Sequence, residues 1–265
     1  MAMDASRADG SAGAPPAFDV VAERLRGVAP ASAPLAPGGA WEAAYTVLLF
    51  HRNPGAVGTA GMGAAPGAWN CNPIGTLRLR RDPESGGTFR MAVDSTVHLP
   101  GGQRDRAIAT LECRADAAGS LVAWRRRTFF DTPVGGLPTT PAREDTGTVA
   151  RGRIVRRPGR SVTVATPAVA SWTLFDTVLR LREPVRCTLL DELDAVRAGQ
   201  LLRRHGDATA QMASGPARLR GVLQTGEGVL PTTWWLAETG PPVLVIAGLR
   251  GWVLDPSAQA AEVGR

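Results

Sequence analysis

From residue 41 onward, apolar and polar residues alternate with a period of two along most of the chain. The segment 88–98 is the clearest case, because Phe89, Met91 and Val93 would lie on one face of an extended chain and polar residues on the other. In the first half, strands are expected at 45–51, 76–80, 88–98, 107–114, 121–130, 148–156 and 161–165. Loops rich in glycine and proline are expected at 55–73 and 132–144. This succession of strands and turns predicts an antiparallel meander.

One segment in the middle of the chain has a helical period instead. Thr166 followed by Pro167 is typical of a helix N-cap and first turn. Trp172, Phe175 and neighbouring apolar residues then recur at helical spacing. We therefore expect a helix at about 167–181, with its Trp and Phe side chains against the sheet.

The alternation resumes after this helix. Further strands are expected at 185–190, 201–205, 217–224, 230–237, 243–247 and 251–254, with a loop or short helix at 191–199 and a long turn at 207–216. A hairpin of the earlier strands is expected to close at Pro158 and Gly159.

The expected fold is mainly β. A sheet of about a dozen strands does not stay flat, so it should curl into a barrel or half-barrel, or split into a sandwich. The helix would pack on or in the curled sheet and cover its apolar face. The candidate core residues are Trp172, Phe175, Trp234 and Trp252.

The ends of the chain differ from the rest. Residues 1–40 form an expected disordered tail, small and polar at its start, in which apolar spacing favours a short helix at 18–28. The antiparallel β domain is expected at 41–255, and residues 256–265 form a second tail. No apolar run approaches the roughly 20 residues of a membrane span, and residues 1–40 lack a signal-peptide pattern. As it stands, the chain is expected in the cytoplasm; an upstream signal peptide would place it in the cell envelope.

Lysine is absent from the sequence, so all 30 basic residues are arginine and the net charge is +6. This excludes the phosphate-binding lysine of a P-loop and any lysine Schiff base. A GC-rich coding bias explains the arginine usage, and selection of guanidinium for anion recognition is the alternative. The arginines alternate with apolar residues and do not form one block, so the pattern does not favour nucleic-acid binding.

The sequence contains no local catalytic or metal motif. The three cysteines, Cys71, Cys113 and Cys187, form no CxxC pair, so buried thiols are expected and no metal. There is no GxSxG elbow, and the near match to GxGxxG at 61–66 ends in proline with no βαβ unit after it. The acidic run 191–194 fits a solvated loop better than a calcium site. We expect no catalytic residue and no cofactor. The alternative is an enzyme whose catalytic residues come together only in the folded structure.

Two groups of residues are candidates for binding. Arg125, Arg126 and Arg127 follow a tryptophan, and strand alternation would put Arg126 on one face and the other two on the opposite face. Together with arginines of nearby strands they could bind an anion: a phospholipid head, a nucleic-acid backbone or an acidic protein. The alternative is an ordinary solvated outer face.

The second group is aromatic, and it is predicted to bind an apolar ligand. Its members are Trp172, Phe175, Trp234 and Trp235. On a strand, Trp234 and Trp235 would point to opposite faces, one into the core and the other under a helix or toward a ligand or partner.

Three runs of the second half resemble an uncharacterised bacterial class of the lipoprotein-carrier type of β half-barrel. They are residues 171–176 (SWTLFD), 228–236 (GVLPTTWWL) and 243–248 (VLVIAG), with a turn at 235–240 (WLAETG). The resemblance, over about residues 41–255, implies a helix inside a curved sheet and a cell-envelope protein that holds an apolar ligand without catalytic residues. The missing signal peptide departs from that class.

The sequence thus predicts a non-catalytic protein that holds an apolar or amphipathic small molecule or lipid, or a partner protein, on a curved β-sheet. An enzyme on the same scaffold and an arginine-mediated binder of nucleic acid or other anions are the alternatives.

Overall fold

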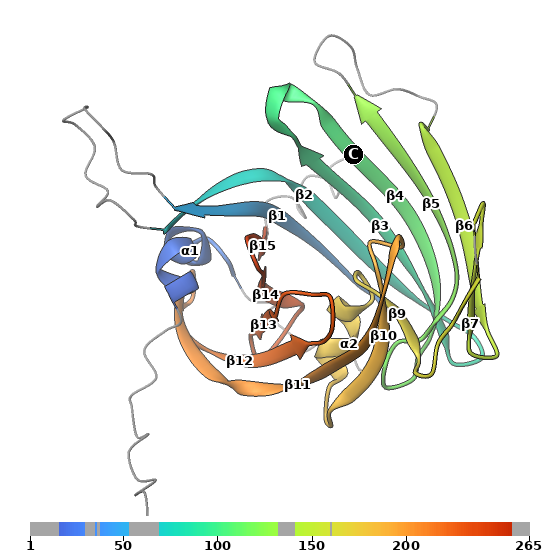
Figure 1. Ribbon diagram of the computed structural model, residues 1–265. Helices are drawn as coiled ribbons and strands as arrows, with labels where there is room; N and C mark the ends of the chain where they lie inside the picture. Colours follow the sequence, from blue (N-terminus) through green and yellow to red (C-terminus); the bar gives the residue numbers. More distant parts are fainter. Residues whose placement is uncertain are drawn as a thin grey trace, which may run out of the picture.

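The computed structural model of the chain describes residues 16–29, 35, 38–52, 69–131, 141–159 and 161–255. These residues form fifteen strands in one sheet, two α-helices and one 3-10 turn (Figure 1). In chain order the elements are α1 (Pro16–Arg26), β1 (Trp41–Arg52), β2 (Trp69–Glu84), β3 (Thr88–His98), the 3-10 turn (Pro100–Gly102), β4 (Arg104–Arg114), β5 (Leu121–Asp131), β6 (Arg143–Ala150), β7 (Arg153–Arg157), β8 (Ser161–Thr163), β9 (Ala168–Ala170), α2 (Leu174–Arg180), β10 (Val185–Asp191), β11 (Ala195–Met212), β12 (Gly215–Thr225), β13 (Thr232–Leu236), β14 (Pro242–Ala247) and β15 (Arg250–Leu254).

The sheet is one long meander that curls but does not close. Every paired strand is antiparallel to its neighbour except β9, which runs parallel to β10. Because β1 pairs with β15, the two edges of the sheet are β8 and β9, which follow each other in the chain without pairing. The prediction of a mainly β protein with a large curled antiparallel sheet and a packed helix is therefore confirmed.

The period of two decides which side chains enter the core. In β3, Phe89, Met91 and Val93 are buried, and the residues between them are partly or fully exposed. In the same way β2 turns Leu77, Leu79 and the charged side chain of Arg81 to the inside. Successive side chains of a strand face opposite sides, so the alternation in the sequence becomes the two faces of the sheet.

The helix α2 lies inside the curl (Figure 1). Its Phe175 ring contacts Tyr45 of β1 at a centroid distance of 5.0 Å and Trp234 of β13 at 4.9 Å. The helix therefore joins two parts of the sheet that are far apart in the sequence.

The expected helix at 167–181 is wrong over its first half. Residues 168–170 are strand β9, which pairs in parallel with residues 188–190 of β10, and the helix begins only after the N-cap Thr173. The three β9 residues are fully apolar and buried, and hydrogen bonds to a neighbouring strand satisfy their backbone there. Trp172 consequently lies in the turn before α2 and not on a helical face.

Other boundaries also differ from expectation. The long turn expected at 207–216 is mostly strand: β11 runs to Met212, and its pairing with β12 shifts register between Arg204 and Asp207. Gly206, with φ of +56°, lies in this irregularity, so the glycine marks a bulge and not a turn. The single strand expected at 148–156 is divided into β6 and β7 by a turn at Arg151 and Gly152.

The remaining loop predictions are only partly inside the described chain. The hairpin expected at Pro158 and Gly159 is confirmed, because β7 pairs with β8 across it. The loops expected at 55–73 and 132–144 are shorter than predicted, since β2 begins at Trp69 and β6 at Arg143. The glycine-rich run at 61–66 and the segments 1–15 and 256–265 lie outside the described residues.

The helix α1 packs on the sheet face opposite α2. Its Phe18 ring lies edge-on to Trp235 of β13 at 5.0 Å, and Val21 and Leu25 are fully buried. Trp234 and Trp235 are successive strand residues, so one contacts α2 and the other α1.

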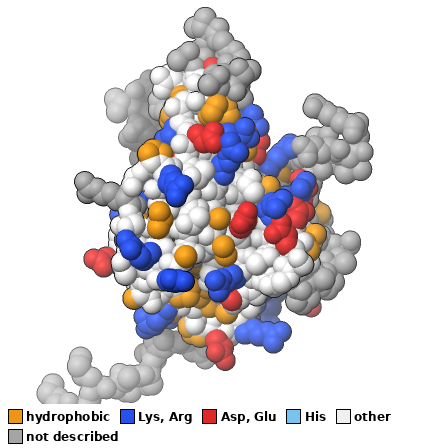
Figure 2. All heavy atoms as spheres, turned by 90° about the vertical axis from the view of Figure 1, so that its right-hand side faces the viewer, with side chains coloured by type: hydrophobic (Ala, Val, Ile, Leu, Met, Phe, Trp, Pro, Cys, Tyr) orange, Lys and Arg blue, Asp and Glu red, His pale blue; other side chains and the backbone are white. Residues whose placement is uncertain are grey.

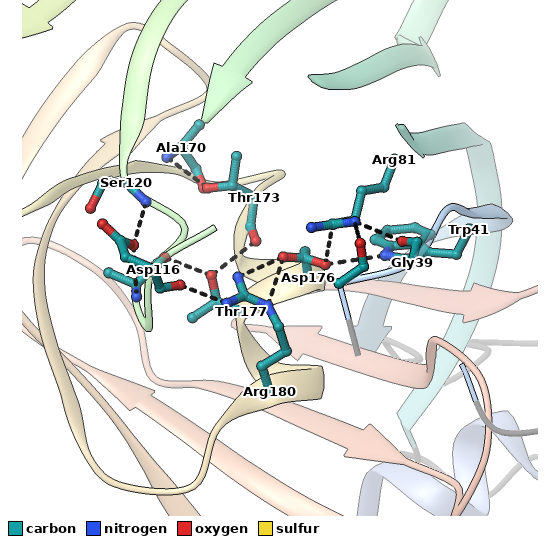
Figure 3. A network of polar contacts seen from close by, with 12 residues as sticks. Gly39, Trp41, Arg81, Asp116, Ser120, Ala170, Thr173, Asp176, Thr177 and Arg180 are labelled. Carbon is teal, nitrogen blue, oxygen red and sulfur yellow. Dashed lines mark hydrogen bonds and ion pairs between the residues drawn. The ribbon is translucent and has the colours of Figure 1, made fainter. Parts of the chain in front are cut away.

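A buried polar network fixes α2 inside the sheet (Figure 3). Arg81 of β2 is 1% exposed and Asp176 of α2 is 2% exposed, and the guanidinium Nε lies 2.9 Å from the carboxylate Oδ1. Trp41 Nε1 donates a hydrogen bond to the same oxygen (3.2 Å), and Arg180 donates to Oδ2 (2.7 Å). One carboxylate of the short helix therefore binds β1, β2 and its own last turn.

The remaining donors of the network reach the backbone of nearby loops. Arg81 donates to the carbonyl oxygen of Gly39 (2.7 Å), and its guanidinium lies 4.4 Å from the ring centroid of Phe89. Arg180 donates to Asp116 O (2.6 Å) and Thr177 to Ala118 O (2.7 Å). Burial lowers the pKa of Arg81, and the charge of Asp176 opposes that shift.

Substitution of Asp176 should destabilise the fold more than substitution of its partner Arg81. Asp176→Leu leaves Arg81 buried without a carboxylate and should lower the free energy of unfolding by about 3–5 kcal/mol. Arg81→Met should cost less, because Asp176 keeps its bonds to Arg180 and Trp41. Urea unfolding measures the difference, with the surface variant Asp207→Asn as control.

The double variant Arg81→Met/Asp176→Leu should recover part of the loss of Asp176→Leu, because no unpaired charge remains inside. Equal losses for both single variants, or additive losses in the double variant, would contradict a coupled buried pair.

Candidate functional site

A cavity of about 270 Å³ lies between the turn before α2 and strands β12 to β15. We call it the aromatic cavity, because four of its lining residues are Trp172, Phe175, Trp234 and Trp252. Trp172, Phe175 and Trp234 are buried, while Trp252 is partly buried.

Three of the four aromatic residues predicted from the sequence come together at this cavity. Trp172, Phe175 and Trp234 line it, and the last two meet edge to face with an interplanar angle of 85°. Trp235 does not: it lies on the other face of β13, under Phe18. The indole Nε1 of Trp234 is buried and has no hydrogen-bond partner among the described residues.

Large apolar side chains at the rim of the concave face are exposed. Leu230, which lines the aromatic cavity, is 65% exposed. It packs directly on Gly248, where a Cβ atom would lie only 2.3 Å from Leu230 Cδ1, so a larger residue at position 248 would displace it. Leu49 is 40% exposed and pairs with Arg250; Phe130 is 56% exposed and pairs with Asp105. Opposite residues of an antiparallel pair share a face, so these side chains lie on the same side as the cavity-lining Arg250 and Asp105.

A second, smaller cavity of about 110 Å³ adjoins the first, and the two share Trp172 and Glu192 as lining residues. We call it the polar cavity. The polar side chains that line it are Ser95, Asp105, Arg126, Thr128, Glu192 and Arg250. It therefore offers hydrogen-bonding groups directly beside an apolar wall.

The three arginines predicted to bind an anion separate as the alternation requires. Arg126 points inward, is buried, and pairs with Asp145 Oδ2 at 2.9 Å. Arg125 is exposed on the opposite face, where it pairs with Glu144 at 2.7 Å. Arg127 is exposed and has no carboxylate partner among the described residues. Anion binding by this triplet stays a prediction.

One of these arginines, Arg126, belongs to a larger set of ion pairs that crosses the opening of the sheet. We call it the arginine–carboxylate cluster: Arg126, Arg143, Arg156, Asp145 and Asp194. Arg156 (2.8 Å) and Arg143 (3.3 Å) of β7 and β6 pair with Asp194 in the turn between β10 and β11. Arg126 of β5 also donates to the backbone oxygen of Glu192 in that turn. The cluster thus links the two ends of the curled sheet.

The acidic run 191–194 accordingly serves as a set of internal partners. Ser171 donates to Asp191 (3.0 Å), Arg250 pairs with Glu192 (3.1 Å), and Asp194 belongs to the cluster. On the side of the molecule in Figure 2, acidic side chains lie among the arginines, and uncharged surface separates many of the basic ones.

The described residues contain no group of three or more His, Cys, Asp and Glu side chains placed to hold a metal ion. Cys113 and Cys187 are buried free thiols, and burial raises the pKa of Cys187 to about 12. Neither helix of the described chain has the length and apolarity that a membrane span requires.

Arg126 and the acidic run 191–194 were visible in the sequence as candidates, but Asp105 and Arg250 of the polar cavity were not. Asp105 of β4 faces the same side as the apolar Ala107, Ala109 and Leu111. A carboxylate in an inward position of an alternating strand was the available signal. Arg250 carried no such signal, because its pairing with Glu192 joins the start of β15 to the turn between β10 and β11, and the sequence does not show that these segments meet.

The sequence matches no protein-family model and is not detectably similar to a curated protein. The fold is similar to the crystal structure of a β-barrel-like protein of a domain of unknown function, DUF1849, from Brucella abortus. The match covers 81% of this chain and 94% of that one, with 12% sequence identity and a TM-score of 0.50. This likeness supports a β-barrel-like fold and carries no assignment of function.

The arginine–carboxylate cluster should make the stability of the fold depend on pH. Hydrogen bonding to Arg156 is the main cause that lowers the pKa of Asp194. A carboxyl whose pKa is lowered by folding stabilises the protein above its unfolded value of about 3.9, and this contribution is lost as the pH falls toward the folded value. Asp194→Asn should therefore lower the urea midpoint at pH 7, and its difference from the wild type should shrink below about pH 4.

Asp207→Asn is the matched control, because Asp207 forms a single surface pair with Arg218 outside the cluster. A midpoint difference for Asp194→Asn that is the same at pH 7 and pH 3 would show that its ion pairs do not hold the opening together.

Proposed function

We propose that the protein is a binding protein that holds a small apolar or amphipathic ligand in the aromatic cavity, without catalysis. The observation that carries this proposal is the wall formed by Trp172, Phe175 and Trp234 around about 270 Å³ of space, with the exposed Leu230 at its rim. Apolar pockets with a few polar groups at one side are the usual form of small-molecule sites.

The size of the cavity limits the ligand. Pockets for drug-sized ligands have volumes of roughly 300–1,000 Å³, so this one suits a chain of about eight carbons or a small ring system. Burial of eight carbons contributes roughly 6 kcal/mol at about 0.8 kcal/mol per CH₂. The loss of translational and rotational freedom offsets much of this, so we expect affinities in the micromolar to millimolar range.

The carboxylates nearest the aromatic cavity support binding over catalysis. Asp191 accepts a hydrogen bond from Ser171, and Glu192 is paired with Arg250. Both acids that line this cavity thus have partners within the protein, which favours a binding role for the cavity. The exposed apolar rim also suits a protein partner, which is the second outcome that the experiment below distinguishes.

Adjacent tryptophans of β13 provide a matched pair for the test. Trp234→Leu should weaken the binding of n-octanol about tenfold, because it removes the ring that forms the cavity wall. Trp235→Leu should leave the affinity unchanged, because that ring lies under Phe18 on the other face. Isothermal titration calorimetry measures the affinity, and both variants should lose stability as buried aromatic residues do.

Native mass spectrometry of gently purified protein then identifies a retained natural ligand. If the wild type binds no short-chain apolar compound, or if both variants weaken binding equally, the aromatic cavity is not the site. If the natural ligand is a partner protein that binds at the rim, Leu230→Ser should lower its affinity and Trp234→Leu should not.

A further inference from the structure

The polar cavity contains one carboxylate that the protein itself does not use. Asp105 lines the cavity, its Oδ1 atom is buried, and this oxygen has no hydrogen-bond partner among the described residues. Asp105 also forms no ion pair within the described chain. Native proteins rarely leave a buried acceptor unsatisfied, so such an atom indicates a bound water or a ligand.

The two arginines that line this cavity already have partners. Arg126 is paired with Asp145 at 2.9 Å, and Arg250 is paired with Glu192 at 3.1 Å. Asp145 is shared with Arg143 (3.3 Å), but each arginine of the lining has a carboxylate within ion-pair distance. Asp105 is the carboxylate of the lining that has no such partner among the described residues. A hydrogen-bond donor that enters the cavity, and a cationic one most strongly, would supply the partner that Asp105 lacks.

The electrostatics of Asp105 agree with this lack of a partner. Burial is the main cause that raises the pKa of Asp105, while the charges of Arg126 and Arg250 lower it. The two arginines therefore do not compensate the loss of water around the carboxylate. A cationic group in direct contact would do so.

The wall between the two cavities also suits a cation. Trp172 lines both of them. An ammonium group beside an indole ring is stabilised by the ring quadrupole, and the ring continues into the apolar space where an alkyl chain would lie.

We propose that the polar cavity takes the protonated amino group of an amphipathic amine, paired with Asp105, while the alkyl part lies in the aromatic cavity. This inference rests on the proposed function and names the class of its ligand. An anionic head group is disfavoured, because it would face Asp105 while both arginines are already paired.

Three ligands of equal chain length test the inference: n-octylamine, n-octanol and octanoate, titrated at pH 7 by isothermal titration calorimetry. The wild type should bind n-octylamine at least tenfold more tightly than n-octanol, and octanoate most weakly. Asp105→Asn should abolish the preference, so that n-octylamine binds no more tightly than n-octanol.

Asp82→Asn is the matched control, because it also removes one carboxylate but from a surface pair with Arg80. It should change none of the three affinities. Asp105→Asn should keep or raise the thermal unfolding temperature, since it removes a charge that has no partner; a lower temperature would contradict the unpaired state of Asp105.

The outcomes separate the two claims. If none of the three ligands binds, the proposed function fails and this inference falls with it. If n-octanol binds but n-octylamine binds no better, or if Asp105→Asn keeps the preference for the amine, the apolar site stands and the amine site is wrong.

Discussion

The buried ion pair between Arg81 and Asp176 is the interaction on which the interior of this protein depends. A curled sheet of this size encloses more space than its own side chains fill, and the seven-residue helix α2 occupies part of it. So short a helix is not stable by itself. It is held because Asp176 binds Arg81 and Trp41 of the sheet, and because Phe175 contacts both Tyr45 of β1 and Trp234 of β13.

The same helix creates the candidate site. Because α2 and the turn before it fill only part of the interior, the aromatic cavity remains between Trp172, Phe175 and strands β12 to β15. Ion pairs inside a protein repay their desolvation only with good geometry, and here Asp176 is bound by Arg81, Trp41 and Arg180 together. The polar network thus fixes the position of α2, and this position leaves the aromatic cavity beside the helix.

A second set of charged residues joins the two ends of the sheet across its open side. The meander returns to its own beginning through the pairing of β1 with β15, which leaves β8 and β9 as unpaired edges. Backbone hydrogen bonds do not close this gap, and the arginine–carboxylate cluster crosses it with side chains. The arginine-rich composition therefore has an internal role, because guanidinium groups can bind carboxylates and backbone oxygens at the same time.

The sequence by itself determined the antiparallel meander, its curl, the inward and outward sides of most strands and three of the aromatic residues at the cavity. These features are local or nearly so, because strand alternation and turn residues act within a few positions. Tertiary structure alone decided that residues 168–170 pair as a strand, that Trp235 lies under α1, that Arg126 meets Asp145 and that Asp105 Oδ1 has no hydrogen-bond partner among the described residues. Alternation tells which side of a strand a residue faces, but not which element covers that side or which distant charge comes within reach.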